Sequence, residues 1–112
     1  MSQITTHILD TSRGMPAQDI IVTLHGERGT TWDYIATGAT NQDGRIPDLL
    51  EPGIELPPGI YKLKFETQHY FDQLNVPTFY PFVEVIFHIS GPEHYHVPLL
   101  LNPFGYSTYR GS

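Results

Sequence analysis

The chain has 112 residues and a mass of 12.7 kDa, so we expect a single domain over residues 1–112. The net charge of -6, the absence of a Lys/Arg cluster and the lack of an apolar run near the roughly 20 residues of a spanning helix argue against nucleic-acid and membrane partners. The sequence contains no cysteine, which excludes a disulfide scaffold, a thiolate zinc site and a cysteine nucleophile.

Ten glycines and ten prolines divide the chain into short segments, several of which alternate apolar and polar residues as all-β sandwiches and barrels do. In chain order, strands are expected at residues 4–9, 20–25, 32–40, 45–47, 59–67, 82–90, 94–102 and 106–111. Tyr70, Phe71 and Leu74 form a helical stripe that predicts one or two turns of helix within residues 66–74. The sequence therefore predicts an all-β fold, a two-sheet sandwich of about eight strands with one short helix.

One residue conflicts with the predicted strand at residues 94–102. Pro98 has no backbone N–H and cannot donate to a ladder of strand hydrogen bonds. Three explanations are compatible with the sequence: the strand lies at a sheet edge there, it is bulged, or its nitrogen side faces no partner strand.

Six histidines occur in the chain, and a neutral imidazole can act as a base, as an acid or as a metal ligand. His94 and His96 are two residues apart on a predicted strand, so both rings project to the same face. They could bind Zn²⁺, one of them could be a base, or the pair could mark a solvated strand end. We expect surface positions without a chemical role for three solitary histidines, which are His25, His69 and His88.

Two further features could belong to a site. Arg45 follows an Asp-Gly turn, where a guanidinium can bind a carboxylate or a polarised carbonyl through two hydrogen bonds, or can cap an exposed hairpin. The segment at residues 106–112 keeps a strand-like aromatic alternation to its last residue, which places Ser107, Tyr109 and Gly111 on one face. The chain end is therefore either part of a site or an edge strand that pairs between subunits.

Three parts of the chain together carry a resemblance to a known family. They are Thr-His-Ile-Leu-Asp at residues 6–10, Asp-Gly-Arg at 43–45, and His-Tyr-His-Val-Pro-Leu-Leu-Leu at 94–101 followed by Tyr-Ser-Thr-Tyr-Arg-Gly-Ser at 106–112. They resemble the 5-hydroxyisourate hydrolases, the transthyretin-related enzymes of urate breakdown. The terminal Tyr-Arg-Gly-Ser is the most specific of these motifs, and the resemblance extends over essentially the whole chain.

The resemblance implies a transthyretin-like fold with two four-stranded sheets and a short helix. It also implies a homotetramer, a dimer of dimers, with sites in a channel between the dimers and with no cofactor or metal ion. The residues implied to be catalytic are His7, Arg45, His96 and Ser112. The residues implied to bind the substrate are His7, Arg45, Tyr109, Arg110 and Gly111. His94 is expected at the rim of the site.

The reaction that the resemblance implies is hydrolysis of 5-hydroxyisourate to 2-oxo-4-hydroxy-4-carboxy-5-ureidoimidazoline, a step of purine degradation. Water must attack a ring amide, which requires a base for the water proton and a cation for the developing oxyanion. His7 or His96 would supply the base, and Arg45 the cation. Ser112 is expected to position the substrate, because no His–acid pair is evident to activate it as a nucleophile, so no covalent intermediate is expected.

Three other functions are compatible with the sequence. They are a carrier of small aromatic ligands in the same channel, a metal-binding sandwich that uses His94, His96 and His7, and an adhesion or scaffold domain. A carrier channel should be lined by apolar and hydroxyl groups. The residues implied for this channel are more polar and titratable, namely His7, Arg45, His96 and Tyr109, and this favours the enzyme over the carrier. No secretory signal is visible at the N-terminus, so we expect a cytoplasmic protein, or a periplasmic one if a signal has been removed.

Overall fold

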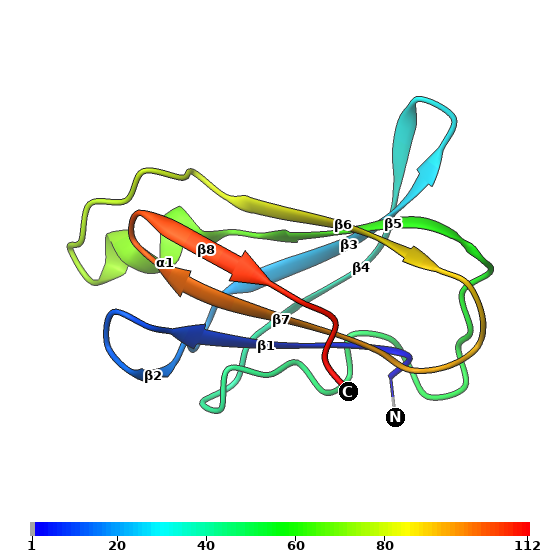
Figure 1. The fold of residues 1–112 in the computed structure, drawn as a ribbon, viewed down its shortest axis with the longest axis horizontal. Coiled ribbons are helices and arrows are strands. Elements are labelled where there is room, and N and C mark those ends of the chain that lie inside the picture. The colour runs from blue at the N-terminus through cyan, green and yellow to red at the C-terminus, as the bar shows by residue number, and fades with distance from the viewer. Residues whose placement is uncertain (1) are drawn as a thin grey trace.

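The computed structural model describes residues 2–112, which form two four-stranded sheets packed face to face (Figure 1). In chain order the strands are β1 (Ile4–Asp10), β2 (Met15–Pro16), β3 (Ile21–Arg28), β4 (Thr31–Ala39), β5 (Gly59–Phe65), β6 (Val83–Ile89), β7 (Tyr95–Asn102) and β8 (Gly105–Thr108). The first sheet has the order β2-β1-β7-β8 and the second sheet the order β4-β3-β5-β6. The predicted two-sheet sandwich of eight strands with one short helix is confirmed.

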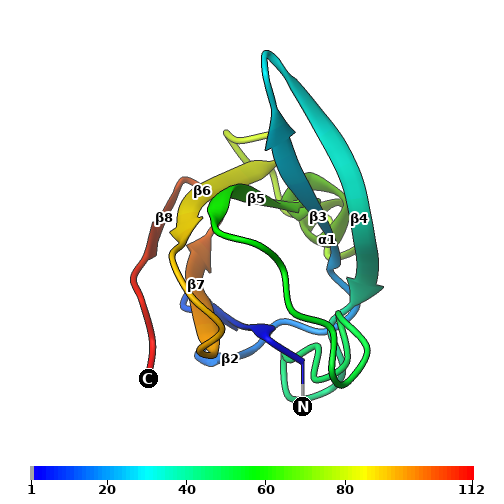
Figure 2. The ribbon, with the colours of Figure 1, turned by 90° about the vertical axis from the view of Figure 1, so that its right-hand side faces the viewer.

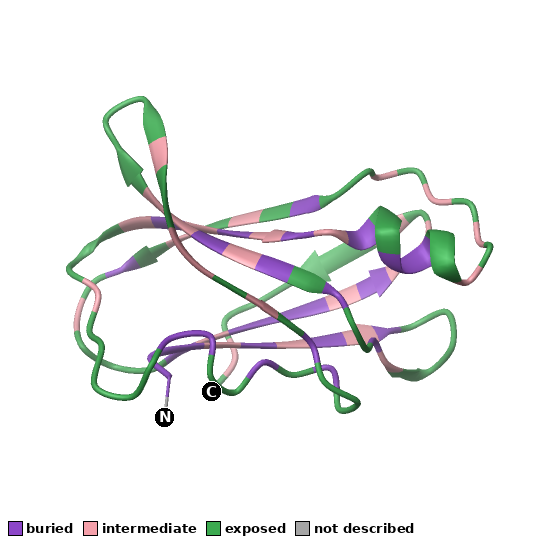
Figure 3. Cartoon of the chain, turned by 180° about the vertical axis from the view of Figure 1, so that it is seen from behind, coloured by how far each residue is buried: buried purple, intermediate pink, exposed green. Residues whose placement is uncertain are grey.

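The core lies between the two sheets because the strands turn alternate residues inward (Figure 3). On β1 the even-numbered residues from Ile4 to Asp10 are buried, and those between them are half-buried. On β7 the inward residues are the odd-numbered ones, from Tyr95 to Leu101. The outer face of the first sheet therefore carries the odd-numbered residues of β1 and the even-numbered residues of β7.

The helix α1 (Thr67–Gln73) closes one end of the sandwich. Tyr70 and Phe71 are buried and Leu74 is half-buried, which confirms the helical stripe read from the sequence. The Tyr70 hydroxyl donates a hydrogen bond of 2.8 Å to the Asp10 carboxylate and so ties the helix to the end of β1. No helix within residues 2–112 has the length and apolarity needed to cross a membrane.

The structure corrects one predicted strand and adds another. The strand predicted at residues 45–47 is wrong, because a single isolated bridge pairs Arg45 with His7 there. The eighth strand is instead β2, which falls between the predicted strands at residues 4–9 and 20–25; Pro16 pairs with Leu9 at the end of β1. The predicted strand at residues 59–67 ends early at Phe65, because α1 begins two residues later.

The position of Pro98 is explained by the end of its neighbouring strand. β7 is an interior strand, parallel to β1 on one side and antiparallel to β8 on the other. The Pro98 carbonyl accepts a hydrogen bond of 2.7 Å from the Thr108 hydroxyl, so the Pro98 nitrogen also faces the β8 side. Because β8 ends at Thr108, the nitrogen of Pro98 faces no partner strand within residues 2–112. Of the three explanations compatible with the sequence, this is the last one, and neither a sheet edge nor a bulge is needed.

The predicted last strand, at residues 106–111, extends three residues too far. Beyond Thr108 the chain leaves β7, and pairing returns only where the Gly111 N–H donates a hydrogen bond of 2.8 Å to the His96 carbonyl. Pro98 accounts for the gap, because the next rung of the ladder would need its missing N–H. Beyond the gap, Gly111 packs on the outward His96, while Arg110 lies over the inward Tyr95.

Both sheets end in a free strand at the same side of the sandwich, as Figure 2 shows for β6 and β8. A cavity of about 380 Å³ opens at this side, and Val85, Phe87 and Thr108 are among the residues that line it. Val85 and Phe87 point inward yet are only half-buried, because the short β8 leaves them uncovered. One copy of the chain therefore leaves this side of its core open to solvent.

Candidate active site

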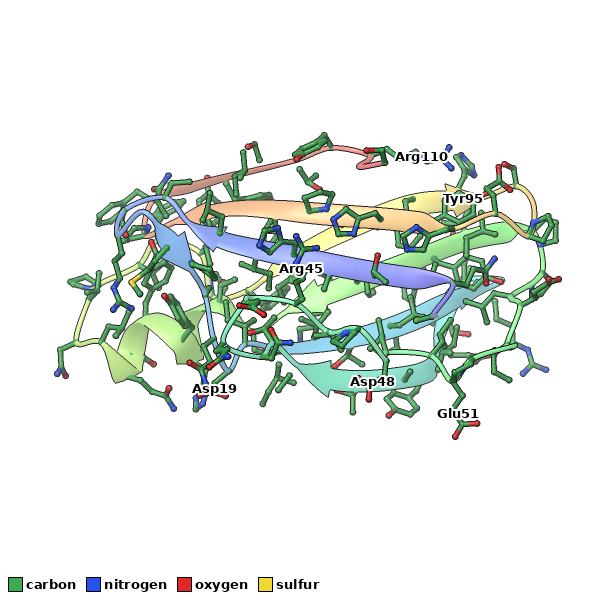
Figure 4. The ribbon with its side chains drawn as sticks, turned by 90° about the horizontal axis from the view of Figure 1, so that it is seen from below. Asp19, Arg45, Asp48, Glu51, Tyr95 and Arg110 are labelled. Atoms are coloured by element: carbon green, nitrogen blue, oxygen red, sulfur yellow. The ribbon has the colours of Figure 1, made fainter. Side chains whose placement is uncertain are left out.

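Three predicted site residues meet on the outer face of the first sheet, seen in Figure 4. Two of them, His7 and His96, lie on the parallel neighbours β1 and β7, where Thr5 is opposite His96 and His7 is opposite Pro98. The two histidines therefore share a face and are offset by two residues, roughly 8 Å between their Cα atoms. The third, Arg45, is bridged to His7.

Arg45 reaches this face from the loop that follows β4. The Asn41 side chain shapes the loop, because its amide oxygen accepts hydrogen bonds from the backbone N–H groups of Asp43 (2.9 Å) and Arg45 (3.1 Å). The Gly44 carbonyl then accepts a hydrogen bond of 2.8 Å from the Ile8 N–H, which docks the loop beside β1. Figure 4 shows the Arg45 side chain over the middle of this strand.

Glycine is required at the point where the loop meets β1. Gly44 has a φ of 74°, in the left-handed region, and a side chain there would collide with the Ile8 carbonyl. The Asp-Gly signal in the sequence thus lets the backbone approach β1 closely. The same approach places Arg45, the next residue, beside His7.

A cavity of about 250 Å³ lies on this face and is lined in part by Arg45, His96 and the terminal Ser112. The side-chain ion pairs of residues 2–112 do not include Arg45, so its charge faces the cavity without a carboxylate side chain to neutralise it. The cavity therefore offers a cation and an imidazole to the same small molecule. A guanidinium in such a place can stabilise a developing oxyanion.

The C-terminus is held at the cavity by its penultimate residue. Gly111 lies directly against the His96 ring, where a side chain would collide with the imidazole, and its N–H is bonded to the His96 carbonyl. This contact places Ser112 at the cavity that Arg45 also lines. The aromatic alternation of the C-terminal segment thus ends in a docked chain end.

Two predicted site residues lie elsewhere, since Tyr109 and Arg110 line the larger cavity at the open side of the sandwich. The Arg110 guanidinium carbon is 4.6 Å from the centroid of the Tyr95 ring, an arrangement visible in Figure 4. His96 lines both cavities. The predicted residues that the structure brings together are His7, Arg45, His96, Gly111 and Ser112.

The surroundings favour the neutral form of both site histidines. Burial lowers the pKa of His96, the positive charge of Arg45 and the neighbouring imidazoles lower it further, and a backbone hydrogen bond to Thr5 partly opposes them. Burial followed by Arg45 also lowers the pKa of His7, against a backbone hydrogen bond and the charge of Asp43. Both rings are therefore uncharged at neutral pH and able to accept a proton.

We expect His7 and His96 to titrate below the ordinary histidine pKa of about 6.5. The variant Arg45→Gln should raise both pKa values, because it removes the nearby positive charge. The native state then binds fewer protons than the unfolded state, so stability from these groups is lost as the pH falls through the lowered pKa values. NMR titration of the ring C–H signals measures the shifts. Lys62→Gln removes a positive charge from the other sheet and is the control, which should leave both pKa values unchanged. A wild-type His7 or His96 ring that titrates above about 6.5 would contradict the expectation.

Thr5 belongs to the site, although no motif pointed to it. Its hydroxyl lies 2.8 Å from Nδ1 of His96 and 2.7 Å from Nε2 of His94. The alternation of β1 places Thr5 on the face of His7, but only the register of β1 against β7 sets it opposite His96. His94, expected at the rim, is exposed and is hydrogen-bonded into this cluster.

The three solitary histidines lie away from this cavity. His88 is exposed on β6, His69 is exposed on α1, and His25 is half-buried on β3 with its ring edge-on to Tyr34. No group of three or more potential metal ligands gathers within residues 2–112.

The chain is similar to known proteins both in sequence and in fold. The family model described as HIUase/Transthyretin family matches residues 4–111. The chain is 46% identical over 114 residues to 5-hydroxyisourate hydrolase of Mus musculus, covering 99% of this chain and 96% of that one. It is 47% identical over 110 residues to 5-hydroxyisourate hydrolase of Salmonella typhimurium, covering 97% of this chain and 80% of that one.

Solved structures show the same architecture. Klebsiella pneumoniae 5-hydroxyisourate hydrolase superposes with a TM-score of 0.84 at 37% identity, covering 97% of this chain and 98% of that chain. Sea bream transthyretin in complex with thyroxine superposes with a TM-score of 0.90 at 32% identity, covering 98% of this chain and 95% of that chain. The similarity in sequence and in structure thus extends over almost the entire chain.

Proposed function

The chain belongs to the HIUase/Transthyretin family, and from this premise we propose that it hydrolyses 5-hydroxyisourate in the cavity lined by Arg45, His96 and Ser112. The reaction adds water across a ring amide C–N bond and gives 2-oxo-4-hydroxy-4-carboxy-5-ureidoimidazoline, a step of urate degradation. The observation that carries the proposal is an unpaired guanidinium beside two imidazoles of lowered pKa, at a cavity where the chain end is docked.

We assign the base to His96. Its Nδ1 is engaged by Thr5, so Nε2 is the ring nitrogen left to face a water molecule in the cavity. Nε2 takes a proton from the water as its oxygen bonds to the ring carbonyl carbon, and returns the proton to the ring nitrogen as the C–N bond breaks. General base catalysis of this kind is worth about 10²–10⁴-fold in rate. His7 supports the site from β1 as a second neutral imidazole beside Arg45.

Arg45 stabilises the oxyanion that forms when water adds to the carbonyl. Its charge is free of side-chain ion pairs within residues 2–112, and the turn at Gly44 fixes its backbone before the substrate binds. Ser112 positions the polar substrate through its hydroxyl and terminal carboxylate. No His–acid pair activates this hydroxyl, so the reaction proceeds without a covalent intermediate.

The rival function is a carrier of small aromatic ligands, and one relative of the same fold is a transthyretin in complex with thyroxine. The composition of the cavity favours the enzyme. A passive pocket for an apolar ligand gains nothing from an unneutralised guanidinium or from titratable imidazoles, which each cost desolvation when covered. Here Arg45 and His96 both face the cavity.

We also propose that the chain acts as a homotetramer, a dimer of dimers. Two features support the assembly: the free edges of β6 and β8 offer unpaired backbone groups to a second copy, and the outer face that carries His7 and His96 is open to a further pair. Pairing at the edges would also cover the half-buried Val85 and Phe87.

The test is whether the purified chain accelerates the disappearance of freshly prepared 5-hydroxyisourate, followed by ultraviolet absorbance, above its spontaneous decay. We expect catalysed ring opening with no added metal or cofactor. A sample heated until unfolded is the control for non-specific acceleration. Displacement of a bound aromatic ligand without any turnover would contradict the enzyme and support the carrier.

A further inference from the structure

The Thr5 hydroxyl joins two imidazoles in one hydrogen-bonded chain. Its oxygen lies 2.8 Å from Nδ1 of His96 and 2.7 Å from Nε2 of His94, and the two rings stack with their centroids 6.2 Å apart. The backbone fixes this geometry. Thr5 is opposite His96 in the parallel ladder of β1 and β7, and His94 precedes His96 by two residues, so all three side chains share the outer face.

The hydroxyl has one proton and two lone pairs, which allows three arrangements. In the first, His96 donates from Nδ1 to the Thr5 oxygen, and Thr5 donates its own proton to Nε2 of His94. In the second, His94 donates from Nε2 to Thr5, and Thr5 donates to Nδ1 of His96. In the third, both rings donate to the Thr5 oxygen, and the hydroxyl proton points to neither ring.

The arrangement decides what His96 can do in catalysis. In the first and third arrangements the ring proton is on Nδ1, so Nε2 has a free lone pair and can act as the base. In the second arrangement a neutral His96 has its proton on Nε2, which then cannot accept a proton from water. When His94 accepts the Thr5 proton, the Thr5 oxygen is left as an acceptor for the Nδ1 proton of His96, so an accepting His94 excludes the second arrangement.

We propose that Thr5 and His94 are positioning residues that hold His96 in the tautomer with a basic Nε2. This inference rests on the proposed function for the role of His96, but the tautomer itself is a property of the free protein. His94 is exposed and forms the outer end of the chain of hydrogen bonds that reaches His96 through Thr5. The charged and titratable residues that line the same cavities as His94 are His96 and Arg45 on one side and Glu55 on the other, and the terminal Ser112 lines the first of these cavities.

The first experiment reads the tautomer without any substrate. Long-range ¹H–¹⁵N correlation of the histidine rings in the full-length protein, at about pH 8 where free imidazole is neutral, separates protonated from unprotonated ring nitrogens. We expect wild-type His96 to have its proton on Nδ1, Thr5→Ser to keep it there, and Thr5→Val to move a large share to Nε2. A wild-type proton on Nε2, or a Thr5→Val spectrum equal to wild type, would overturn the proposal.

The second experiment measures turnover of 5-hydroxyisourate. We expect Thr5→Val to lower kcat about tenfold with little change in KM, because part of the general-base contribution is lost while Arg45 still binds the substrate. Thr5→Ser should restore kcat. His94→Gln, whose amide oxygen can accept the Thr5 proton, should retain more activity than His94→Leu. Equal kcat for Thr5→Val and Thr5→Ser would contradict the role of the hydroxyl.

Two controls separate this role from a loss of structure. Thr23→Val removes a comparable hydroxyl from β3 on the other sheet, and His69→Leu removes an exposed imidazole from α1; both should leave kcat unchanged. Thermal unfolding identifies any variant that fails to fold. If the wild-type chain showed no turnover, the proposed function would fail, while the ring spectra would still decide the tautomer.

Discussion

Replacing His96 with alanine is expected to lower kcat by about 10²–10⁴-fold, the usual contribution of a general base. The side chain is half-buried on the outer face of β7, so its loss removes the base without opening a cavity in the core between the sheets. His7→Ala should also lower turnover by orders of magnitude, since it removes the second neutral imidazole beside Arg45. The measurement is the ultraviolet ring-opening assay together with size-exclusion chromatography.

His88→Ala is the matched control. This imidazole is exposed on β6, in the other sheet, and it does not line the cavity of Arg45 and Ser112, so its loss tests whether the larger cavity, which it lines together with Tyr109 and Arg110, is dispensable for turnover. The elution volume of each variant should equal that of the wild type, which shows that the assembly survives. Near-normal turnover in both His96→Ala and His7→Ala would remove the imidazoles from the mechanism.

Removing residues 109–112 is expected to abolish turnover while the sandwich itself remains folded. β8 ends at Thr108, so the truncation leaves every described strand intact. It removes Ser112 from the cavity, the Gly111 contact with His96, and the Arg110 guanidinium that stacks on Tyr95, a contact worth about 0.5–1 kcal/mol. Turnover, circular dichroism and light scattering on the truncated chain test this expectation.

A second truncation makes the result specific. Deleting Ser112 alone retains Gly111 against His96 and Arg110 over Tyr95, so it separates the loss of the terminal group from the loss of tail docking. We expect this shorter deletion to lower activity with no change in assembly, whereas the longer deletion also weakens the packing between dimers. Full activity in a tetramer that lacks residues 109–112 would refute a site at the chain end.

Most of the fold is predictable from the sequence, because strands that bury one face alternate with a period of two. The buried even-numbered residues of β1 and the odd-numbered residues of β7 follow this rule closely. The two-residue β2 is too short to show any period, so its pairing with the end of β1 was not predictable. At Arg45 the apparent strand is a loop, since the Asn41 side chain takes the backbone N–H that a ladder would use.

The site was only partly predictable from spacing. Alternation shows which neighbours share a face with His7 on its strand and with His96 on its own. That both lie on the same face of one sheet depends on the parallel pairing of β1 with β7, two strands from opposite ends of the chain. The family resemblance implied that the two histidines belong to one site. The bond of Thr5 to His94 and His96 was missed for the same reason. Register decides which hydroxyl meets which ring, and a threonine in a strand is otherwise an ordinary residue.

Pro98 has a consequence for local motion at the chain end. By removing one rung between β7 and the tail, it separates the four terminal residues from the cooperative ladder that ends at Thr108. Detaching the tail then breaks the hydrogen bond from Gly111 to His96 and the stacking of Arg110, without melting a strand. Such a local opening would move Ser112 away from the cavity lined by Arg45 and His96 while the strands beneath it stay paired.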